Sequence, residues 1–401
     1  MSGFGYHNAG NAVLNAFHDS LSQSSNNLIQ NIKHQGSRLG LSIYLVGGPV
    51  RDLMLGLVPG DIDLVVEGDA IRLATLVTHD PSIKVITHSR FGTATLKIGK
   101  ERLDMATARC ETYSKSGSLP KVSPSTIFDD LHRRDLTINS MALALSGPAK
   151  GNLLDPLSGQ RDLERGLIRI THKDSFMNDA TRIFRAIRYE QRLSFHIERT
   201  TQTALGQAIN LNALDTISPD RLRRELYLML SEEEPLKAIL RAGRLGLMHS
   251  LYRPLGNISW LERLCGITGS VSPLILIAGL AYKMRLQEGE AFIKRLNMST
   301  RWANIIRDLI NLKRLDLPSY ATNHSSSSLY NLLEDYSSTS VKSLIYLTTN
   351  DQVRDILVRH LEQLRNIKPI SKGQDIVARG IPQGPAVGKV LALLKEARLD
   401  G

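Results

Sequence analysis

The sequence predicts an α+β protein, with a mixed β-sheet in its N-terminal part and helices in the rest of the chain. Between residues 41 and 145, short runs of alternating aliphatic and polar residues are bounded by Gly, Asp or Ser, as expected for strands and turns. From about residue 161 onwards, apolar residues recur at helical spacing. The chain has 401 residues, 42% of them hydrophobic, which is enough for several domains and a substantial core.

The elements are expected in a simple order along the chain. Residues 1–40 have the spacing of packing helices, and Ser218 followed by Pro219 marks the start of a later helix. Serine-rich stretches near 324–328 and 336–340 predict a hinge between two helical parts. The β-rich part predicts helices near 50–57 and 69–78, and strands at 43–48, 61–68, 83–89, 93–99 and 102–108.

Charge and cysteine content restrict the class of protein. The net charge of +11 favours a polyanionic partner such as RNA, DNA or free nucleotide, and no polybasic run or lipidation signal supports a membrane surface. The longest apolar stretch, 273–282, is too short to span a bilayer and predicts a buried helix. Cys110 and Cys265 form neither a disulfide framework nor a zinc site. With no visible secretory signal, a cytoplasmic location is expected.

The most informative segment is YLVGGPVRDLMLGLVPGDIDLVV, residues 44–66. Asp61 and Asp63 alternate along a predicted strand, so their carboxylates lie on the same face and repel one another unless a cation lies between them. Oxygen ligands without thiol or imidazole suit magnesium. The turn at Gly47 and Gly48 allows close backbone approach, and the following helix start with Arg51 suits an anion. Together these features indicate a nucleoside triphosphate with its metal ion.

A second segment, LHRRDLTINSMALAL at 131–145, places basic residues before an apolar run. Arg134 is a candidate phosphate or ribose ligand because its forked guanidinium matches such groups. Asp135 is expected to orient this arginine through a charge-assisted hydrogen bond, and Asn139 to be a structural amide that joins neighbouring loops. The alternative is an ordinary surface ion pair at the start of a helix.

A third segment, NDATRIFRAIRYEQRLSF at 178–195, carries Arg182, Arg185 and Arg188 within about 120° of a predicted helix. The alternative is a solvated basic face. Asp179 and Arg182 are expected to be i,i+3 neighbours on the helix. A carboxylate beside a guanidinium offers an acceptor and donors, which match the amino group and ring nitrogen of cytosine and adenine better than the edges of uracil or guanine.

Two further features accompany these segments. Asp104 lies on a strand-like run and has either a catalytic role, placing a metal ion or a 3′-hydroxyl, or a structural one. Residues 108–130 form a long polar stretch rich in turn residues, and such loops are often mobile and functional. Arg109 and Glu111 are a basic and acidic pair at the start of this stretch.

The three segments together resemble the class II tRNA nucleotidyltransferase and bacterial poly(A) polymerase family. Residues 44–66 are similar to the family's motif A, RRDLTINSMAL at 133–143 to its RRDxTxNAxA motif, and residues 178–195 to its EDxxR region with the arginines that follow. The resemblance covers about residues 41–230. One departure is Asn178, which stands where the motif has an acid; its carbonyl can orient Arg182, but without charge.

The resemblance implies specific roles for these residues. Asp61 and Asp63 would hold two Mg²⁺ ions, and Gly48 and Arg51 would contact the incoming nucleotide. The loop near Arg109 would correspond to the flexible element that members use to change from C to A addition, and its length argues against a CC-only enzyme. The base and phosphates would be bound by Arg134, Asp179, Arg182, Arg185 and Arg188.

The resemblance also implies an arrangement of domains and a function. A nucleotidyltransferase head at 1–145 would be followed by a helical neck at 146–232 with the base-template motif, a helical body at 233–322 and a helical tail at 323–401. The enzyme would add CCA to the 3′ end of tRNA from CTP and ATP without a nucleic-acid template, holding the acceptor and T-stem through their phosphates. No protein partner is predicted.

Five other functions stay open on sequence alone. A-adding or CC-adding tRNA nucleotidyltransferases and a poly(A) polymerase share nearly every motif. A nucleotidyltransferase acting on a small molecule leaves the long basic helical half unexplained. A non-catalytic RNA-binding protein accounts for the charge, but it has no need of Asp61 and Asp63.

Overall fold

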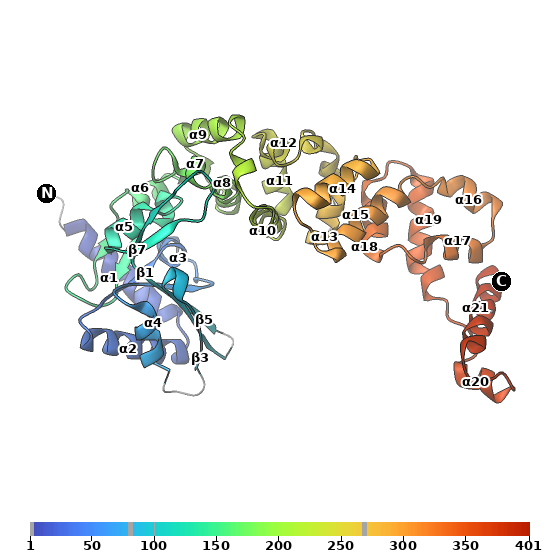
Figure 1. Ribbon diagram of the computed structural model, residues 1–401, viewed down its shortest axis with the longest axis horizontal. Helices are drawn as coiled ribbons and strands as arrows, with labels where there is room; N and C mark the ends of the chain where they lie inside the picture. Colours follow the sequence, from blue (N-terminus) through green and yellow to red (C-terminus); the bar gives the residue numbers. More distant parts are fainter. Residues whose placement is uncertain (1–3, 79–82, 100, 267–270) are drawn as a thin grey trace. The chain divides into compact units, whose positions relative to one another are not determined.

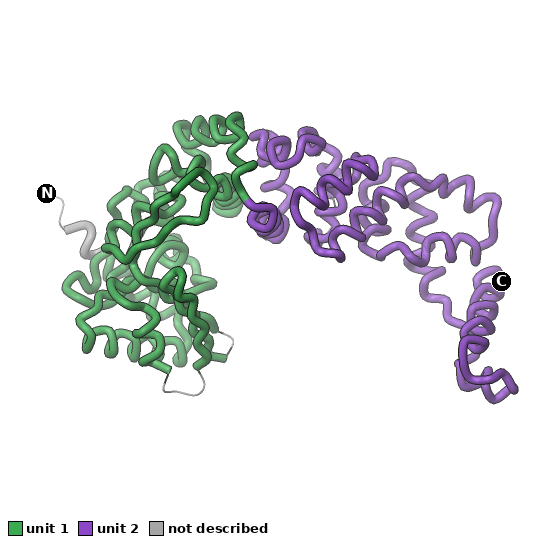
Figure 2. The backbone as a smooth tube through the Cα atoms, in the orientation of Figure 1, with its two compact units in different colours: residues 1–217 green, residues 218–401 purple. Residues whose placement is uncertain are grey.

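The chain divides into two compact parts. The computed structural model describes residues 4–78, 83–99, 101–266 and 271–401. Its first unit comprises residues 1–217 and its second residues 218–401 (Figure 2). The first contains the β-sheet and the second is helical (Figure 1), which confirms the predicted α+β class. The finer division into head, neck, body and tail stays a prediction.

The first unit is built around a seven-stranded sheet of β1 (Ser42–Val46), β2 (Ile62–Glu67), β3 (Ile83–His88), β4 (Thr93–Ile98), β5 (Glu101–Thr107), β8 (Ala142–Ala144) and β9 (Leu153–Leu154). The order across the sheet is β3-β4-β5-β2-β1-β8-β9. β2 and β5 are parallel, whereas β3-β4, β4-β5, β1-β2, β1-β8 and β8-β9 are antiparallel. The five predicted strands are confirmed as β1 to β5, in a mixed sheet.

The helices of the first unit follow the predicted order, and those near 50–57 and 69–78 are confirmed as α3 and α4. Three short 3-10 helices, η1 (Ser89–Phe91), η2 (Thr137–Asn139) and η3 (Ala213–Thr216), also lie in the described part of this unit. The α-helices are α1 (Phe4–Ser20), α2 (Gln23–Arg38), α3 (Gly48–Met54), α4 (Ala70–Leu76), α5 (Ile127–His132), α6 (Gly159–Glu164), α7 (Ser175–Asn178), α8 (Thr181–Arg192) and α9 (Arg199–Asn210).

The two faces of the sheet pack against different helices, because successive side chains on a strand point to opposite faces. On one face, Ile43 of β1 lies so close to Gly36 of α2 that a Cβ at position 36 would meet its Cδ1 at 2.6 Å. On the other face, Tyr44 and Val65 join a buried cluster with Ile127 of α5. Asp63 precedes Val65 by two residues and therefore lies on the α5 face.

Two small strand pairs lie outside this sheet. The antiparallel pair β6 (Arg109–Thr112) and β7 (Lys121–Pro124) occupies the segment 108–130 that the sequence analysis treated as a long loop. The expectation of a long loop was wrong for the residues that form β6, β7 and α5. Only the residues between and around these elements lack regular structure. The parallel pair β10 (Leu167–Ile168) and β11 (His196–Ile197) is short and lies within the part expected to be helical.

The second unit consists of helices. The predicted helix start at Ser218 and Pro219 is confirmed, and residues 273–280 form a helix with a buried core, Leu276–Leu280. The α-helices are α10 (Pro219–Leu230), α11 (Pro235–Arg244), α12 (Leu247–Leu251), α13 (Pro273–Leu280), α14 (Leu286–Arg295), α15 (Thr300–Leu312), α16 (Leu317–Asn323), α17 (Ser326–Leu333), α18 (Ser338–Leu347), α19 (Asp351–Glu362), α20 (Gly373–Ala378) and α21 (Pro385–Asp400).

The serine-rich stretches cap helices, and the hinge expected from them stays a prediction. Ser325 accepts a hydrogen bond from the Ser328 amide at the start of α17, and Ser337 accepts one from the Ser340 amide at the start of α18. Serine is favoured at this position because its hydroxyl satisfies an amide that has no partner within the helix. Among the described residues, no helix is both long enough and apolar enough to cross a membrane.

His360 of α19 is a buried titratable group in the second unit. Its side chain is fully inaccessible to solvent, and neither ring nitrogen has a hydrogen-bond partner. Burial, with a smaller contribution from Arg365, lowers its pKa from 6.5 to about 4. At mildly acidic pH the His360 imidazole is therefore neutral in the folded chain and protonated in the unfolded chain.

We expect this histidine to make the second unit less stable as the pH falls from about 6.5 towards 4. In that window the unfolded state binds the proton and the folded state does not, so the free energy of unfolding should be about 2 kcal/mol lower at pH 5 than at pH 7.5. His360→Leu should reduce this loss, as measured by urea unfolding at pH 7.5 and pH 5. The exposed His324 provides the control, and an equal change in His324→Leu would contradict the assignment.

Candidate active site

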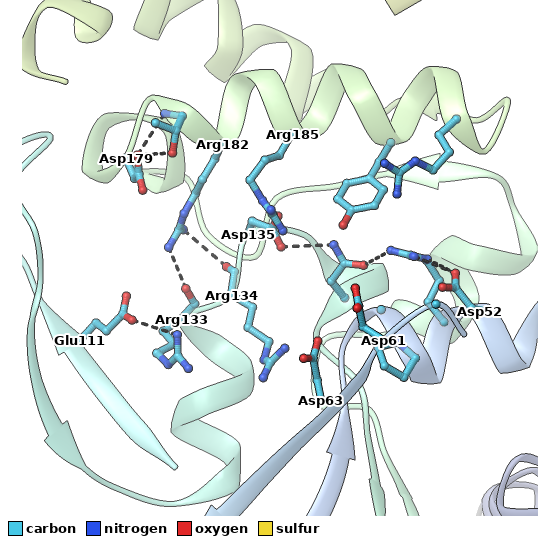
Figure 3. A pocket seen from close by; sticks show the side chains of 18 of the residues that line it. Asp52, Asp61, Asp63, Glu111, Arg133, Arg134, Asp135, Asp179, Arg182 and Arg185 are labelled. Carbon is cyan, nitrogen blue, oxygen red and sulfur yellow. Dashed lines mark hydrogen bonds and ion pairs between the residues drawn. The ribbon is translucent and has the colours of Figure 1, made fainter. Parts of the chain in front are cut away.

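Three carboxylates come together on adjacent strands of the sheet. Asp63 on β2 lies opposite Asp104 on β5 in the parallel register, and Asp61 directly precedes β2. Figure 3 shows Asp61 and Asp63 close together at the same pocket. Asp104 accepts a hydrogen bond from Thr95 Oγ1 at 2.5 Å and forms an ion pair with Arg102 at 2.8 Å. It lines a neighbouring pocket that shares Asp63.

The environment of Asp63 favours a cation. Burial raises the pKa of Asp63 to about 6; Arg134 acts in the opposite direction, and the carboxylates of Asp104 and Asp61 raise the pKa further. A divalent cation would offset this repulsion, and the all-oxygen donor set suits a hard ion. Within the described residues no group of three or more acidic, His or Cys side chains is placed to hold a metal by itself. An ion here would therefore take further ligands from substrate or water.

The glycine turn before α3 has two different glycines. Gly47 has φ +74°, and a Cβ there would lie 2.7 Å from Nη1 of Arg134, so both the backbone and the packing require glycine. Gly48 begins α3, and a Cβ there would make only an ordinary contact of 3.7 Å with Arg51 Nη2. Gly48 lines the pocket, whereas Gly47 is not among the residues that line it.

One buried carboxylate at the end of α5 fixes two arginines. Asp130 accepts hydrogen bonds from Arg133 Nε at 3.0 Å and from Arg134 Nη2 at 2.9 Å. Burial alone would raise the pKa of Asp130, but Arg134 and Arg133 hold it below its ordinary value. The expectation that Asp135 orients Arg134 was wrong. Asp130 lies within α5 and Arg134 just beyond the C-terminal end of this helix, four residues later, where an i,i+4 contact between them is geometrically natural.

Asp135 instead joins α8 to the glycine turn through a continuous chain of hydrogen bonds. It accepts from Arg185 Nε at 2.5 Å and from Asn139 Nδ2 at 3.3 Å. Asn139 Oδ1 accepts from Arg51 Nη1 at 2.6 Å, and Arg51 forms an ion pair with Asp52 at 2.7 Å. Burial would raise the pKa of Asp135, but mainly Arg185 lowers it to about 2. The structural role expected for Asn139 is confirmed.

Asp179 lies before α8 and not on it. Its backbone is extended, with φ −149° and ψ 98°, and the helix begins at Thr181. The Asp179 carboxylate accepts hydrogen bonds from the amide and the hydroxyl of Thr181, at 3.0 Å and 2.6 Å. The helical i,i+3 geometry expected for Asp179 and Arg182 was therefore wrong, although both side chains line the same pocket (Figure 3).

The guanidinium of Arg182 is held by acceptors from several segments. Its Nη1 donates to Ser175 Oγ at 2.7 Å and its Nη2 to the carbonyl of Arg133 at 2.8 Å, with longer contacts of 3.5 Å to the Arg134 carbonyl and the Tyr113 hydroxyl. These contacts, and not the side chain of Asn178, set the orientation of Arg182.

The β6–β7 hairpin packs beside Arg182. The predicted pair of Arg109 and Glu111 is confirmed at 3.3 Å, and Glu111 also binds Arg133 at 2.9 Å. Only Glu111 of this pair lines the pocket, whereas Arg109 donates to the carbonyl of Phe91. Tyr113 donates to Glu111 at 2.9 Å, and burial raises the pKa of its hydroxyl to about 12.

The turn of this hairpin contacts the segment just before Asp179. The Ser116 hydroxyl donates to the carbonyl of Met177, and the Gly117 amide donates to the carbonyl of Asn178 at 3.1 Å. Gly117 has φ +72°, and a Cβ there would overlap Thr216. The hairpin is thus joined to the end of α7, just before Asp179, by hydrogen bonds to backbone carbonyls, and such contacts carry no strong sequence signal.

The arginines of α8 do not all face the pocket. Arg182 and Arg185 line it, but Arg188 does not, and its side chain is buried elsewhere. Residues spaced by three, such as Arg182, Arg185 and Arg188, shift by about 60° around the helix at each step. A spacing of three, four and three keeps the residues closer to one face. The face of α8 that lines the pocket also contains Tyr189 and Arg192. These two residues were not among the predicted site residues, although their spacing from Arg185 is visible in the sequence.

These groups surround one pocket of about 630 Å³. All of it belongs to the first unit, and both acidic and basic side chains line it (Figure 3). The residues that line it are Gly48, Pro49, Arg51, Asp52, Gly60, Asp61, Asp63, Glu111, Tyr113, Pro120, Arg133, Arg134, Asp135, Asn139, Asp179, Thr181, Arg182, Arg185, Tyr189 and Arg192.

The mixed sheet, the paired carboxylates and the arginine-lined pocket define the class of nucleotidyltransferases. Comparison with known proteins agrees with this. Residues 43–169 match the model of the poly(A) polymerase head domain, and residues 194–256 match a probable RNA- and SrmB-binding site of polymerase A. The chain belongs to the family of tRNA nucleotidyltransferases and poly(A) polymerases, which are enzymes.

Individual relatives differ in length. The chain is 31% identical over 383 residues to an A-adding tRNA nucleotidyltransferase of Halalkalibacterium halodurans, covering 93% of this chain and 88% of that protein. It is 34% identical over 399 residues to an A-adding tRNA nucleotidyltransferase of Geobacter sulfurreducens, covering 93% of this chain but 45% of that protein. The chain thus spans about half the length of the Geobacter relative.

Solved structures resemble the whole chain. The Thermotoga maritima CCA-adding enzyme in complex with tRNA has a TM-score of 0.76 and 30% identity, covering 97% of this chain and 95% of that one. A CCA-adding enzyme in complex with CTP has a TM-score of 0.78 and 30% identity, covering 97% and 94%. The resemblance inferred from the sequence motifs is confirmed.

We expect Asp130 to be essential for the stability of the first unit. Asp130→Ala leaves two buried or half-buried arginines without their shared carboxylate, which should lower the free energy of unfolding by about 3–5 kcal/mol. The neighbouring Asp129 is exposed and only caps α5, so Asp129→Ala should cost about 1 kcal/mol. Urea unfolding followed by circular dichroism measures both, and equal losses would contradict the assignment.

The two glycines of the turn should respond differently to alanine. Gly47→Ala places a side chain at positive φ and displaces Arg134, so it should destabilise the chain by about 1–2 kcal/mol or more. Gly48→Ala meets no clash within the protein and should leave the free energy of unfolding unchanged or slightly raised. Thermal unfolding of the two variants tests this, and a larger loss in Gly48→Ala would show that the turn is assigned wrongly.

Proposed function

We propose that this enzyme transfers AMP from ATP to the 3′ end of tRNA without a nucleic-acid template. The observation that carries the proposal is the position of Asp61 and Asp63 at one side of a pocket whose other walls carry six arginines. This arrangement suits a metal-bound triphosphate better than any uncharged ligand. The carboxylates can bind the metal ion, and the arginines can bind the negatively charged phosphates.

The carboxylates Asp61 and Asp63 would hold Mg²⁺, the hard cation that their donor set fits. When bound, Mg²⁺ would lower the pKa of the RNA 3′-hydroxyl and neutralise charge on the triphosphate. Asp104, opposite Asp63 on the next strand, supports the same negative region, although its ion pair with Arg102 makes it a supporting residue in this proposal.

The remaining residues bind and orient the nucleotide. Gly48 and Arg51 contact the phosphates at the glycine turn, and Arg134 contacts the phosphates or ribose from the α5 side. Arg185 lines the pocket between them, bound to Asp135. The 3′-hydroxyl attacks the α-phosphate in line, a new phosphodiester forms, and pyrophosphate leaves.

Base selection falls to Asp179 and Arg182 at the other end of the pocket. Both side chains line it, and their acceptor and donor groups match adenine and cytosine. The β6–β7 hairpin contacts the residues immediately before Asp179, so the part of the chain with Arg109 and Glu111 is connected to the base-binding end. Arg188 supports α8 from outside the pocket.

The second unit would hold the RNA. Most of the chain's surplus of Lys and Arg over Asp and Glu falls in residues 218–401. Such a surplus binds phosphates without reading bases, as needed for an enzyme that acts on many tRNAs. The acceptor and T-stem are the RNA parts near the 3′ end and are the proposed contacts.

Complete CCA addition, the function predicted from the sequence, is the second candidate. Full-length similarity to solved CCA-adding enzymes favours it. Addition of A alone is favoured because the A-adding relatives match 88–93% of the chain at 31–34% identity, whereas a CCA-adding enzyme of Lactobacillus gasseri is 27% identical. CC-adding relatives match only 47–49% of the chain, which argues against CC addition.

The test uses tRNAs that end before the CCA sequence, after one C, and after CC, each with CTP or ATP alone. We expect AMP addition to the CC-ended tRNA, and CMP addition to the shorter tRNAs only if the second candidate is correct. Asp61→Asn with Asp63→Asn should lower AMP incorporation more than about 100-fold while tRNA binding in a gel-shift assay persists. Long A-tails, or CMP addition without AMP, would contradict the proposal.

A further inference from the structure

One aromatic ring in the pocket is surrounded by three arginines. Tyr189 of α8 lines the pocket, and the distances from its ring centroid to Cζ are 4.8 Å for Arg51, 5.4 Å for Arg192 and 5.6 Å for Arg185. Each guanidinium is attracted to the ring by about 0.5–1 kcal/mol at such sites, but the three positive charges repel one another. Their concentration at one side of the pocket indicates an anionic ligand there.

The three arginines differ in their exposure to solvent, which is lowest for Arg51 and greatest for Arg192. Arg51 forms an ion pair with Asp52 at 2.7 Å, and Arg185 forms one with Asp135 at 2.5 Å. These carboxylates fix both guanidiniums and offset their charge. Arg192 is the last residue of α8, and its side chain is exposed at the edge of the pocket. It is therefore placed to meet a ligand that enters from solvent.

We propose that Arg192 binds the terminal phosphates of the incoming nucleoside triphosphate and that Tyr189 is the residue that positions it. This inference rests on the proposed function. Arg192 lies ten residues after Arg182 on one face of α8, a distance of about 15 Å along the helix axis. That span matches an extended nucleotide whose base lies at Arg182 and whose phosphates reach the side of the pocket where Arg51 lies.

Guanidinium chemistry supports a phosphate at this position. Arginine presents several donors in a planar fork that matches two oxygens of one phosphate, and hydrogen bonds between charged groups are the stronger ones. The ring of Tyr189 restricts where the Arg192 side chain can lie, which reduces the entropy lost on binding. Tyr189 follows Arg185 by four residues and precedes Arg192 by three, so it is adjacent to both on the helix surface.

A purely structural role for Arg192 needs a control. Arginine at the end of a helix stabilises the helix through its dipole and its free carbonyls, with or without a ligand. Arg165 stands at the equivalent end of α6, is exposed, and does not line the pocket. Arg165→Gln therefore reports the cost of removing a helix-terminal arginine alone.

The experiment compares ATP and AMP binding by isothermal titration calorimetry in the full chain. Arg192→Gln should raise the dissociation constant for ATP about tenfold or more and change that for AMP less than about twofold. Arg192→Lys should restore part of the ATP affinity, and Arg165→Gln should bind both nucleotides as the unchanged chain does. Equal loss for ATP and AMP, or no loss for ATP, would overturn the inference.

Variants of Tyr189 test the positioning role. Tyr189→Leu removes the ring and should weaken ATP binding without an equal effect on AMP, and Tyr189→Phe should restore the ATP affinity. If Tyr189→Leu binds ATP unchanged, the ring does not position Arg192. Failure of the unchanged chain to bind ATP at all is a separate outcome, because it contradicts the proposed function and not the assignment of Arg192.

Discussion

The buried carboxylate of Asp135 is the interaction on which the arrangement of the pocket depends. Through Arg185 on one side and Asn139 on the other, it joins helix α8 to helix α3, which carries Arg51. Its pKa of about 2 means that this charge persists at any ordinary pH. Asp130 likewise holds the side chain of Arg134 in place through an ion pair. The walls of the pocket are thus in place before a ligand binds, which lowers the cost of ordering them on binding.

The sequence predicted the elements of the first unit well because their patterns are local. The strands β1 to β5 alternate cleanly, and the GG turn and the Asp61–Asp63 pair are contiguous in the chain. Each of these features follows from the backbone geometry of a few adjacent residues. The family resemblance added an order to the motifs, which local patterns do not supply.

The partners of the site residues were harder to predict because they depend on contacts between distant segments. Asp135 was paired with its sequence neighbour Arg134, yet it binds Arg185, fifty residues away. Arg188 was predicted to bind the nucleotide because it continues the three-residue spacing of Arg182 and Arg185. In the structure Tyr189 and Arg192 line the pocket, and Arg188 does not. The sequence contains that second spacing, but choosing between the two requires knowing which side of α8 lines the pocket.

All residues that line the pocket lie between 48 and 192, within the first unit. The relatives described as CC-adding match only about half of this chain. Two A-adding relatives are much longer than this chain, which covers less than half of each. Under the proposed function, a change in the second unit can therefore alter how the protein holds RNA without altering any residue that lines the reaction pocket. Substrate range and chemistry would then be encoded in different parts of the chain.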